Sequence, residues 1–511
     1  MSHGSARPRL AVGTLGAVAA LDLLLHLVTI HQYGYFRDEL YYLACTHHLG
    51  WGYVDQPPLS IGILAAVRTL FGDSLFALRI VPALAGVATV FLTGMMARRL
   101  GGARFSQGLA ALAVLLSPVY LGTTHVYSMN SFDLLFWALA AWLLLRALED
   151  GLPRDWLALG ATLGLGLLNK ISVFWLIGGI GVGLLVTPYR RVLREPWPWV
   201  AALIAAILFL PHVLWQIEHG WPTLEFMRNA TSMKMMGAAP LGFLKNQLLD
   251  MNVGSAPIWI AGTLYGLFSP VAGRGRVLAL IYLAVLGLLL VAGTARASYL
   301  APAYFGLLAM GGVAIERAAA HPRRWLQPAT AALTIAGGLV SLPMALPVLP
   351  VETFVRYQSA LGMSPQTEER QQMGALPQHY ADMFGWEELT SLVAKAYGRL
   401  SPEERRRVRV FGQNYGEAGA IDVLGQRLGL PQAISGHNSY WLWGPGEANW
   451  DVLIIIGGDR EDNAEFFDDI EIVGQTSSPW SMPYERGLDV SIARRPKISL
   501  REAWPMVKRY I

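Results

Sequence analysis

Long apolar runs recur along the first 350 residues, and this pattern constrains the fold more than any other feature. A helix of about 17 to 25 apolar residues can cross a bilayer, and the runs predict about 11 transmembrane helices. The runs lie near residues 10–31, 77–97, 107–122, 131–148, 156–170, 171–187, 199–216, 255–271, 277–293, 298–316 and 326–347. With 53% hydrophobic and 15% charged residues, the chain is too apolar for an ordinary soluble domain. We expect a polytopic α-helical membrane protein.

Basic residues indicate how these helices are oriented. Loops on the cytoplasmic side of a membrane are enriched in Lys and Arg. Arginines occupy alternate loops, as Arg7 and Arg9, Arg98, Arg99 and Arg104, Arg146 and Arg154, Arg190, Arg191 and Arg194, Arg274 and Arg276, and Arg317, Arg323 and Arg324. With an odd number of spans, this predicts a cytoplasmic N-terminus and places residues 32–76 on the outer face. The net charge of only +4 indicates membrane topology and no nucleic-acid partner.

The composition divides the chain into two predicted domains. Residues 1–349 form the transmembrane domain, with the outer loop 32–76 as its candidate active-site segment. Residues 350–511 regain charged residues and contain no run long enough to span a membrane. Short buried strands are expected at 408–411, 452–456, 470–473 and 488–493, and helices at 416–428 and 460–467. We therefore predict a C-terminal soluble α/β domain on the outer face.

The outer loop carries an acidic cluster, formed by Asp38, Glu39 and Asp55. Carboxylates beside a membrane are costly and indicate a functional site. Neighbouring helical residues point about 100° apart, so one of Asp38 and Glu39 faces the site while the other holds the loop. Tyr41 and Tyr42 suit a short helix at the interface. The alternative is that Arg37 and the two carboxylates form solvated ion pairs at a helix end.

These motifs resemble a known family. An outer loop with Asp38-Glu39, a later Asp55-Gln56-Pro57-Pro58-Leu59, and an Arg-rich return after the second span resemble the family 39 glycosyltransferases of the GT-C fold. This family includes the protein O-mannosyltransferases and the lipid A aminoarabinose transferases. Residues 215–226, 298–304, 414–419 and 435–441 look like segments of its bacterial members.

The resemblance implies an inverting transfer of a sugar from a polyprenyl-phosphate donor to an envelope acceptor on the outer face. It assigns the catalytic base to Asp38, and a single displacement needs no second acid carboxylate. Positive groups must then stabilise the departing phosphate. The candidates are Lys170, Arg296 and Arg37. The aminoarabinose transferases carry Lys where this chain has Gln56, which puts that phosphate contact and that substrate in doubt.

Other polar residues complete the candidate site. His125, Tyr127, Asp133 and Tyr299 are expected to line the cavity. Asp22 and His26 lie four residues apart in the first span and can form a hydrogen bond with each other. No cofactor is required, but His47 and His48, with Asp55 nearby, are an alternative site for a divalent metal ion. Adjacent histidines point apart, which disfavours metal binding.

Together these features predict a bacterial inner-membrane glycosyltransferase whose N-terminus is cytoplasmic and whose C-terminal domain is periplasmic. The main alternative is a secondary transporter or lipid flippase that uses Asp22, His26 and Asp133. The absence of an evident internal repeat disfavours it. A non-catalytic envelope scaffold or sensor is a third reading, in which Asp38 is replaceable. Which sugar is moved, and to which lipid, glycan or protein, does not follow from these patterns.

Overall fold

The computed structural model describes residues 7–237, 239–319, 321–365, 367, 369–446 and 451–511. The chain forms two compact units, and each is built from separate segments. The first contains Met1–Ile30, Phe76–Leu214 and Gly237–Pro350, and the second contains His31–Leu75, Trp215–Met236 and Val351–Ile511. The predicted outer loop thus belongs to the same unit as the C-terminal region. The division into domains 1–349 and 350–511 stays a prediction.

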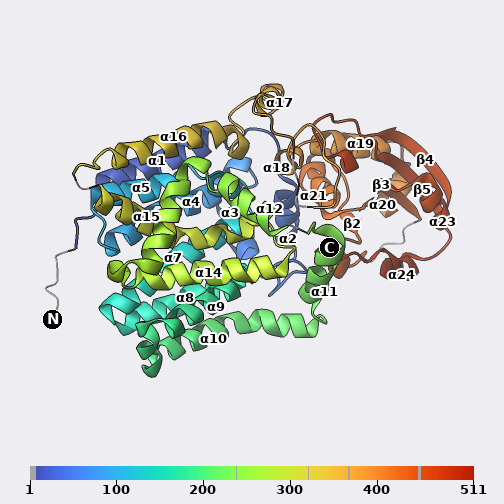
Figure 1. Cartoon of the computed structure of the whole chain (residues 1–511). Coiled ribbons are helices and arrows are strands. Elements are labelled where there is room, and N and C mark those ends of the chain that lie inside the picture. Colours follow the sequence, from blue (N-terminus) through green and yellow to red (C-terminus); the bar gives the residue numbers. More distant parts are fainter. Residues whose placement is uncertain (1–6, 238, 320, 366, 368, 447–450) are drawn as a thin grey trace. The chain divides into compact units, whose positions relative to one another are not determined.

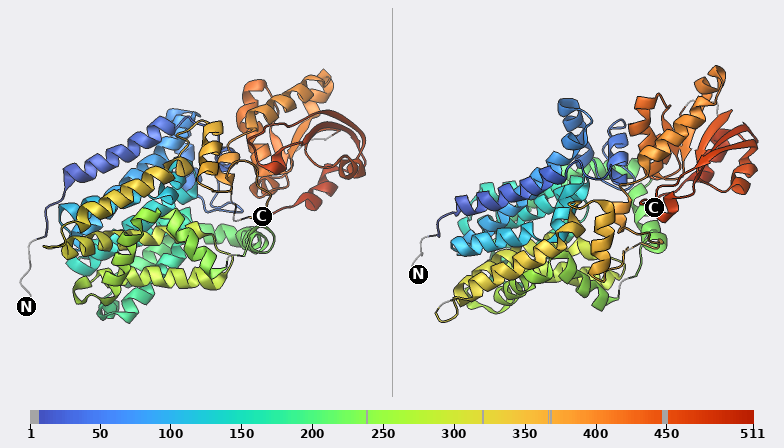
Figure 2. Two further views of the ribbon diagram at one scale, coloured as in Figure 1. Left: turned by 45° about the horizontal axis from the view of Figure 1, so that its top comes forward. Right: turned by 90° about the horizontal axis from the view of Figure 1, so that it is seen from above.

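The first unit is a bundle of long helices that run side by side (Figures 1 and 2). Its α-helices are α1 (Val12–Thr29), α4 (Leu75–Arg99), α5 (Arg104–Leu115), α6 (Pro118–His125), α7 (Met129–Asp150), α8 (Pro153–Asn169), α9 (Val173–Val186), α10 (Trp197–Glu218), α12 (Pro240–Asp250), α13 (Ala256–Phe268), α14 (Gly275–Ala292), α15 (Phe305–Ala318) and α16 (Leu326–Ala345). Helix α4 starts, and α10 ends, in the second unit. The helices share one continuous apolar core.

Long apolar helices account for most of the 11 expected spans. Among the described residues, seven helices are long and apolar enough, or up to nine if each bent pair counts as one span. The predicted span 107–122 is one bent pair, because α5 and α6 meet at 59° and Pro118 starts the second helix. The predicted span 255–271 contains the 13-residue α13. The chain is a multi-pass membrane protein, and the count of about 11 spans stays a prediction.

Arginines from several inter-helix loops gather around one acidic pair in the first unit. Arg7 and Arg99 each form ion pairs with both Glu149 and Asp150, at distances of 2.6–3.2 Å. Arg274 adds a third cation, 3.2 Å from Glu149. These three loops therefore lie at the same end of the first unit, as the alternate placement of arginines requires. Which end faces the cytoplasm stays a prediction.

The second unit contains a five-stranded sheet and shorter helices. Its strands are β1 (Arg409–Gly412), β2 (Ala433–Ser435), β3 (Val452–Ile456), β4 (Phe467–Gln475) and β5 (Asp489–Pro496), in the order β2-β1-β3-β5-β4. Strands β1, β2 and β3 are parallel, and β5 is antiparallel to both β3 and β4. The helices are α2 (Arg37–Cys45), α3 (Leu59–Phe71), α11 (Pro222–Asn229), α17 (Val351–Ala360), α18 (Gln378–Ala381), α19 (Trp386–Gly398), α20 (Pro402–Arg407), α21 (Tyr415–Leu424), α22 (Ser439–Trp443), α23 (Arg460–Phe466) and α24 (Leu500–Ala503).

Helices cover both faces of this sheet (Figure 2). Leu453 and Ile455 of β3 pack with Leu500 and Trp504 on one face, and α19 and α21 lie against the strands on the other. The α/β fold confirms the predicted fold class of this region. The expected strands at 408–411, 452–456, 470–473 and 488–493 correspond to β1, β3, β4 and β5, whereas the three-residue β2 was too short to be recognised.

A glycine allows α21 to pack closely against α2, the helix that carries Asp38. A Cβ on Gly419 would lie 2.9 Å from the carbonyl carbon of Leu40 and 3.0 Å from its oxygen. Both atoms belong to the backbone of α2, so no side-chain rotation can relieve the overlap. Gly419 therefore allows the close approach of α21 to the acidic helix α2.

We expect Gly419→Ala to destabilise the second unit by about 1–3 kcal/mol, because overpacking forces the backbone apart. Gly398→Ala is the matched control, since a Cβ at this helical glycine meets nothing within 4 Å. Thermal unfolding of both purified variants in the same detergent measures the difference. Equal melting temperatures would show that α2 and α21 have room to move.

Candidate active site

The acidic motif lies at the start of α2, where its two adjacent carboxylates have different surroundings. Glu39 is fully buried, and its carboxylate accepts a hydrogen bond of 2.9 Å from the backbone N–H of Phe36. This contact closes the first turn of the helix. The Asp38 side chain, by contrast, is 32% exposed. Glu39 is therefore placed to hold the loop at the start of α2. Asp38 is the carboxylate that a substrate can reach.

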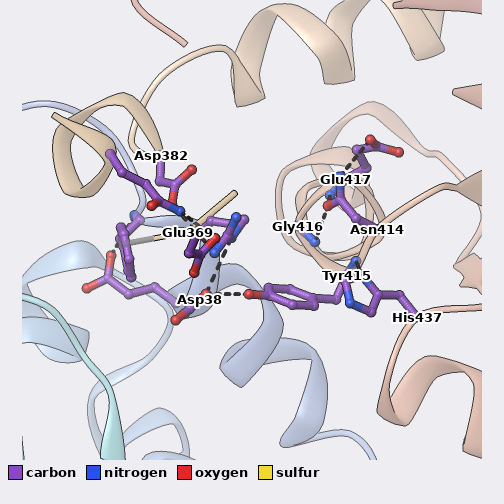
Figure 3. Close-up of polar contacts among 12 residues, drawn as sticks. Asp38, Glu369, Asp382, Asn414, Tyr415, Gly416, Glu417 and His437 are labelled. Carbon is purple, nitrogen blue, oxygen red and sulfur yellow. Dashed lines mark hydrogen bonds and ion pairs between the residues drawn. The ribbon is translucent and has the colours of Figure 1, made fainter. Parts of the chain in front are cut away.

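Asp38 is held by groups that lie far from it in the sequence (Figure 3). The hydroxyl of Tyr415, the first residue of α21, donates a 2.9 Å hydrogen bond to Asp38 Oδ1. Arg37 Nε lies 3.5 Å from the same oxygen, and the guanidinium lies over the Tyr415 ring, 5.3 Å from its centroid. The Tyr415 backbone N–H in turn donates to His437 Nδ1 at 3.4 Å. These contacts fix one carboxylate oxygen of Asp38.

Arg37 is shared among several buried partners. It donates a 2.6 Å hydrogen bond to the hydroxyl of Tyr484, and its Nη2 lies 3.6 Å from Asp382 Oδ2. The Asp382 side chain is only 2% exposed, and burial raises its pKa to about 6, although the Arg37 charge opposes that rise. The predicted phosphate contact Arg37 is therefore already engaged by carboxylates within its own unit.

Asp55 lies beside two hydroxyl groups. The Tyr41 hydroxyl is 2.8 Å from Asp55 Oδ1 and 2.7 Å from Ser439 Oγ. Burial raises the pKa of Asp55 to about 6, and the Tyr41 hydrogen bond partly opposes this shift. Tyr42 is buried, with its ring packed edge-on against Tyr41. Next to Asp55, the Gln56 amide is buried and has no hydrogen-bond partner among the described residues.

A second pair of carboxyl groups lies around Asn414, which precedes α21. Asn414 Nδ2 donates to Glu417 Oε1 at 2.7 Å and to Glu485 Oε1 at 2.9 Å. Burial raises the pKa of Glu485 to about 7, and burial together with Glu485 raises the pKa of Glu417 well above its usual value. The two groups are therefore not both ionised at neutral pH.

The raised pKa values predict that the second unit loses stability as pH rises from 5 to 8. Asp382 and Glu485 have folded-state pKa values of about 6 and about 7. Unfolded Asp and Glu titrate near ~4, so the folded state holds more protons in this window. The protonated carboxyl groups stabilise the fold fully below pH ~4. As pH rises from 5 through the folded-state pKa of each group, this stabilisation falls by about 2 kcal/mol per group. Thermal melts in one detergent at pH 5 to 8 measure this fall.

Glu485→Gln should flatten this pH dependence, because the amide is neutral throughout and still offers Oε1 to Asn414. Glu471→Gln is the control, since ion pairs with Arg399 and Arg494 lower the pKa of this half-exposed carboxyl. The same steep fall in wild type and Glu485→Gln would contradict the assignment.

Within the first unit, the structure brings together three of the predicted site residues. Lys170 Nζ lies 3.4 Å from Asp133 Oδ2 and 5.2 Å from the centroid of the Tyr299 ring. Ser172 also donates to Asp133 Oδ2, at 2.9 Å. The Lys170 side chain is 15% exposed. These groups form a polar cluster with one cation at its edge.

The remaining predicted residues have other neighbours. Arg296 precedes the 3₁₀ helix η5 (Ala297–Tyr304), which carries Tyr299. His125 ends α6, and the Tyr127 ring packs edge-on against Phe132.

The structure does not bring together the side chains of Asp22 and His26, or those of His47 and His48. His26 Nε2 lies 2.8 Å from Thr124 Oγ1, so this histidine bonds Thr124 in place of the expected Asp22. His47 Nε2 lies 3.2 Å from Arg68, whereas the His48 ring stacks on Trp443 at 4.2 Å. His47 and His48 therefore contact different neighbours.

Sequence reasoning missed the residues that surround Arg37 and Asp38. Asp382 and Tyr484 lie in segments without a recognisable motif, and more than 300 residues separate them from Arg37. Tyr415 lies within the segment 414–419, which resembles the bacterial family members, but this tyrosine was not predicted as a site residue. Only the folding of the second unit places these three residues beside Arg37 and Asp38.

Comparison with known proteins gives sequence matches over part of the chain. Residues 55–215 match the model of the dolichyl-phosphate-mannose-protein mannosyltransferase family. The lipid A galacturonosyltransferase RgtD of Rhizobium johnstonii is 25% identical over 209 residues, which cover 40% of this chain and 43% of that protein. The undecaprenyl phosphate-alpha-4-amino-4-deoxy-L-arabinose arabinosyl transferase of Pseudomonas paraeruginosa is 29% identical over 175 residues, which cover 33% of this chain and 32% of that protein. The aligned segments thus span less than half of these relatives.

The fold matches over nearly the whole chain. The crystal structure of ArnT from Cupriavidus metallidurans, bound to undecaprenyl phosphate, has a TM-score of 0.64 at 15% identity and covers 94% of this chain and 98% of that one. The arabinofuranosyltransferase AftD from Mycobacteria has a TM-score of 0.55 at 16% identity and covers 95% and 40%, respectively. The chain therefore shares the fold of these membrane glycosyltransferases, and its residues 55–215 match the mannosyltransferase family model.

Proposed function

We propose that the protein transfers a sugar from a polyprenyl-phosphate donor to a hydroxyl group of an envelope acceptor, with Asp38 as the base. The observation that carries this proposal is the setting of Asp38. Its carboxylate is partly exposed, and Tyr415 and Arg37 orient one oxygen. A base must be fixed within hydrogen-bond reach of the proton that it removes, and the other Asp38 oxygen meets that need.

The transfer is a single displacement at the anomeric carbon of the donor. Asp38 takes the proton of the acceptor hydroxyl while the hydroxyl oxygen attacks that carbon. The bond between the anomeric carbon and the phosphate oxygen breaks, and its electron pair leaves with the polyprenyl phosphate. The anomeric configuration is inverted. Because phosphate is a good leaving group, the step needs no second carboxylic acid of the kind that glycosidases use.

Lys170 is the proposed contact of the donor phosphate. It combines a partly exposed ammonium group with Asp133 and the Tyr299 ring around it. A cation at the departing phosphate stabilises the charge that develops in the transition state. Arg296 is a second candidate, because it lies three residues before Tyr299. The buried amide of Gln56, which has no hydrogen-bond partner in the described part of the chain, is a further group suited to a polar ligand.

The names of the relatives support the substrate class. RgtD is a lipid A transferase, and the arabinosyl transferases use an undecaprenyl-phosphate sugar. We extend the polyprenyl-phosphate donor to this chain, and we place the reaction at the periplasmic face of the inner membrane. A lipid-linked donor is consistent with a protein that carries at least seven candidate membrane spans.

The test is transfer of radiolabelled sugar by the purified full-length protein. Extracted bacterial polyprenyl-phosphate sugars serve as the donor pool, and extracted lipopolysaccharide, glycans and envelope proteins are offered as separate acceptors. Label should move to one acceptor class and depend on added enzyme. No transfer to any class would contradict the proposal, and transfer from a nucleotide sugar alone would contradict the donor assignment.

A further inference from the structure

A pocket lined by many polar and charged side chains lies in the second unit, at the carboxyl ends of the parallel strands β1 and β2. Its volume is about 540 Å³, within the range of small-molecule sites. Gln413, Asn414 and Tyr415 follow the carboxyl end of β1, and His437 follows β2. Strand β2 pairs with one side of β1, and β3 pairs with the other side. The connections from these strands therefore run in opposite directions, which makes the carboxyl end of β1 a topological switch point. Ligands of open α/β sheets bind at such points.

One of the cations that line the pocket, Arg509, forms no ion pair among the described residues, although its charge acts on the buried carboxyl of Glu417, which also lines the pocket. Lys508 pairs with Glu225 at 2.8 Å, and Lys234 lies 3.6 Å from Glu369. Arg37 is engaged by Asp382 and Asp38. By contrast, the exposed guanidinium of Arg509 has no ion pair or hydrogen bond among the described residues. The pocket is therefore suited to a ligand with one anionic group.

The remaining polar lining is suited to hydroxyl groups. The half-buried side-chain amide of Gln413 lines the pocket and makes no hydrogen bond within the described part of the chain, so its oxygen and nitrogen are both available. An amide can donate one hydrogen bond and accept another, which matches neighbouring hydroxyls of a sugar. Asn414, with both of its amide atoms already bonded, forms a fixed wall.

The pocket shares a wall with the proposed base. Arg37 and Tyr415 both line it, and both contact Asp38 Oδ1, at 3.5 Å and 2.9 Å. A ligand seated against these two side chains is separated from Asp38 by one residue. We infer that this pocket binds the acceptor, a sugar that carries one anionic group, either a carboxylate or a phosphate. Arg509 holds the anion and Gln413 binds hydroxyls. This assignment rests on the proposed function.

Ligand binding by the full-length protein in lipid nanodiscs, without any donor, tests this inference. The probes are glucuronic acid, glucose 6-phosphate and glucose, and saturation-transfer difference NMR gives their relative affinities. At least one acidic probe should bind about tenfold more tightly than glucose, because a charge-assisted hydrogen bond contributes at least this much. The two acidic probes distinguish a carboxylate from a phosphate.

Arg509→Gln should remove the preference for acidic probes and raise the KM for the acceptor about tenfold with kcat unchanged. Arg427→Gln is the control, since Arg427 is also an exposed arginine of this unit but does not line the pocket. Equal binding of glucose and both acidic probes would overturn the inference, as would a preference that survives Arg509→Gln. If transfer depended on Asp38 but the protein did not prefer acidic probes over glucose, only the assignment of the pocket would be refuted. If acidic probes bound through Arg509 but no sugar were transferred, only the proposed reaction would be refuted.

Discussion

Replacing Asp38 with Asn should reduce sugar transfer by about 10² to 10⁴-fold, the usual contribution of a general base. The amide cannot take the proton of the acceptor hydroxyl. The substitution is nearly isosteric, and Asn still offers an oxygen to the Tyr415 hydroxyl. We therefore expect little change in melting temperature and in the KM for the donor. The measurement is initial-rate transfer of labelled sugar by purified wild type and variant at matched protein concentration.

Two further variants make this result specific. Asp73→Asn is the control, because Asp73 lies in the same 32–76 segment but forms an exposed ion pair with Arg68. It should retain transfer. Asp55→Asn tests the other acidic residue of the segment, whose pKa of about 6 and contact with Tyr41 indicate a supporting role. If Asp55→Asn removed transfer while Asp38→Asn kept it, the base would be Asp55.

Replacing Arg37 with Gln should destabilise the second unit by about 3 kcal/mol, the usual cost of breaking a buried ion pair. The guanidinium contacts Asp382, Tyr484 and Asp38, and its loss leaves the nearly buried Asp382 carboxylate without a cation. Since Asp382 has a pKa of about 6, it is neutral at pH 5 and charged at pH 8. The destabilisation should therefore be larger at pH 8. Thermal unfolding at both pH values measures it.

Arg399→Gln is the matched control for that experiment. Arg399 pairs with Glu471 at 2.8 Å, but both side chains are about 40% exposed. Exposed ion pairs contribute at most about 1 kcal/mol, so this variant should melt close to wild type. Equal, small losses for Arg37→Gln and Arg399→Gln would show that Arg37 is dispensable for the fold.

Much of the architecture could be predicted because it depends on local patterns. Long apolar runs identified a multi-pass membrane protein, and buried strands such as 452–456 identified the α/β region. The number of spans depends on shorter helices, because α8 and α13 are apolar but have only 17 and 13 residues. Nor does run length show where a helix bends. Arg104–Leu115 and Pro118–His125 form one continuous apolar run in sequence but two helices in space.

The candidate site was predictable only in part. Asp38 stood out because adjacent carboxylates near a membrane are rare, and the different roles expected for Asp38 and Glu39 agree with their different burial. Tyr415, Asp382 and Tyr484 could not be found in this way. Each is an ordinary residue type in its own segment, and it acquires a role only through contacts with residues more than 300 positions away.

Composition and periodicity predicted the membrane class and the α/β character of the tail, whereas the choice of Asp38 as the base came from the family resemblance and stays a proposal. Which residues surround Asp38 became evident only from the tertiary structure. Arg37 was expected to meet a phosphate, but folding surrounds it with Asp382, Tyr484 and Asp38. The physical reason is that a charge pairs with its nearest neighbours in space, and chain topology brings those neighbours together from distant positions.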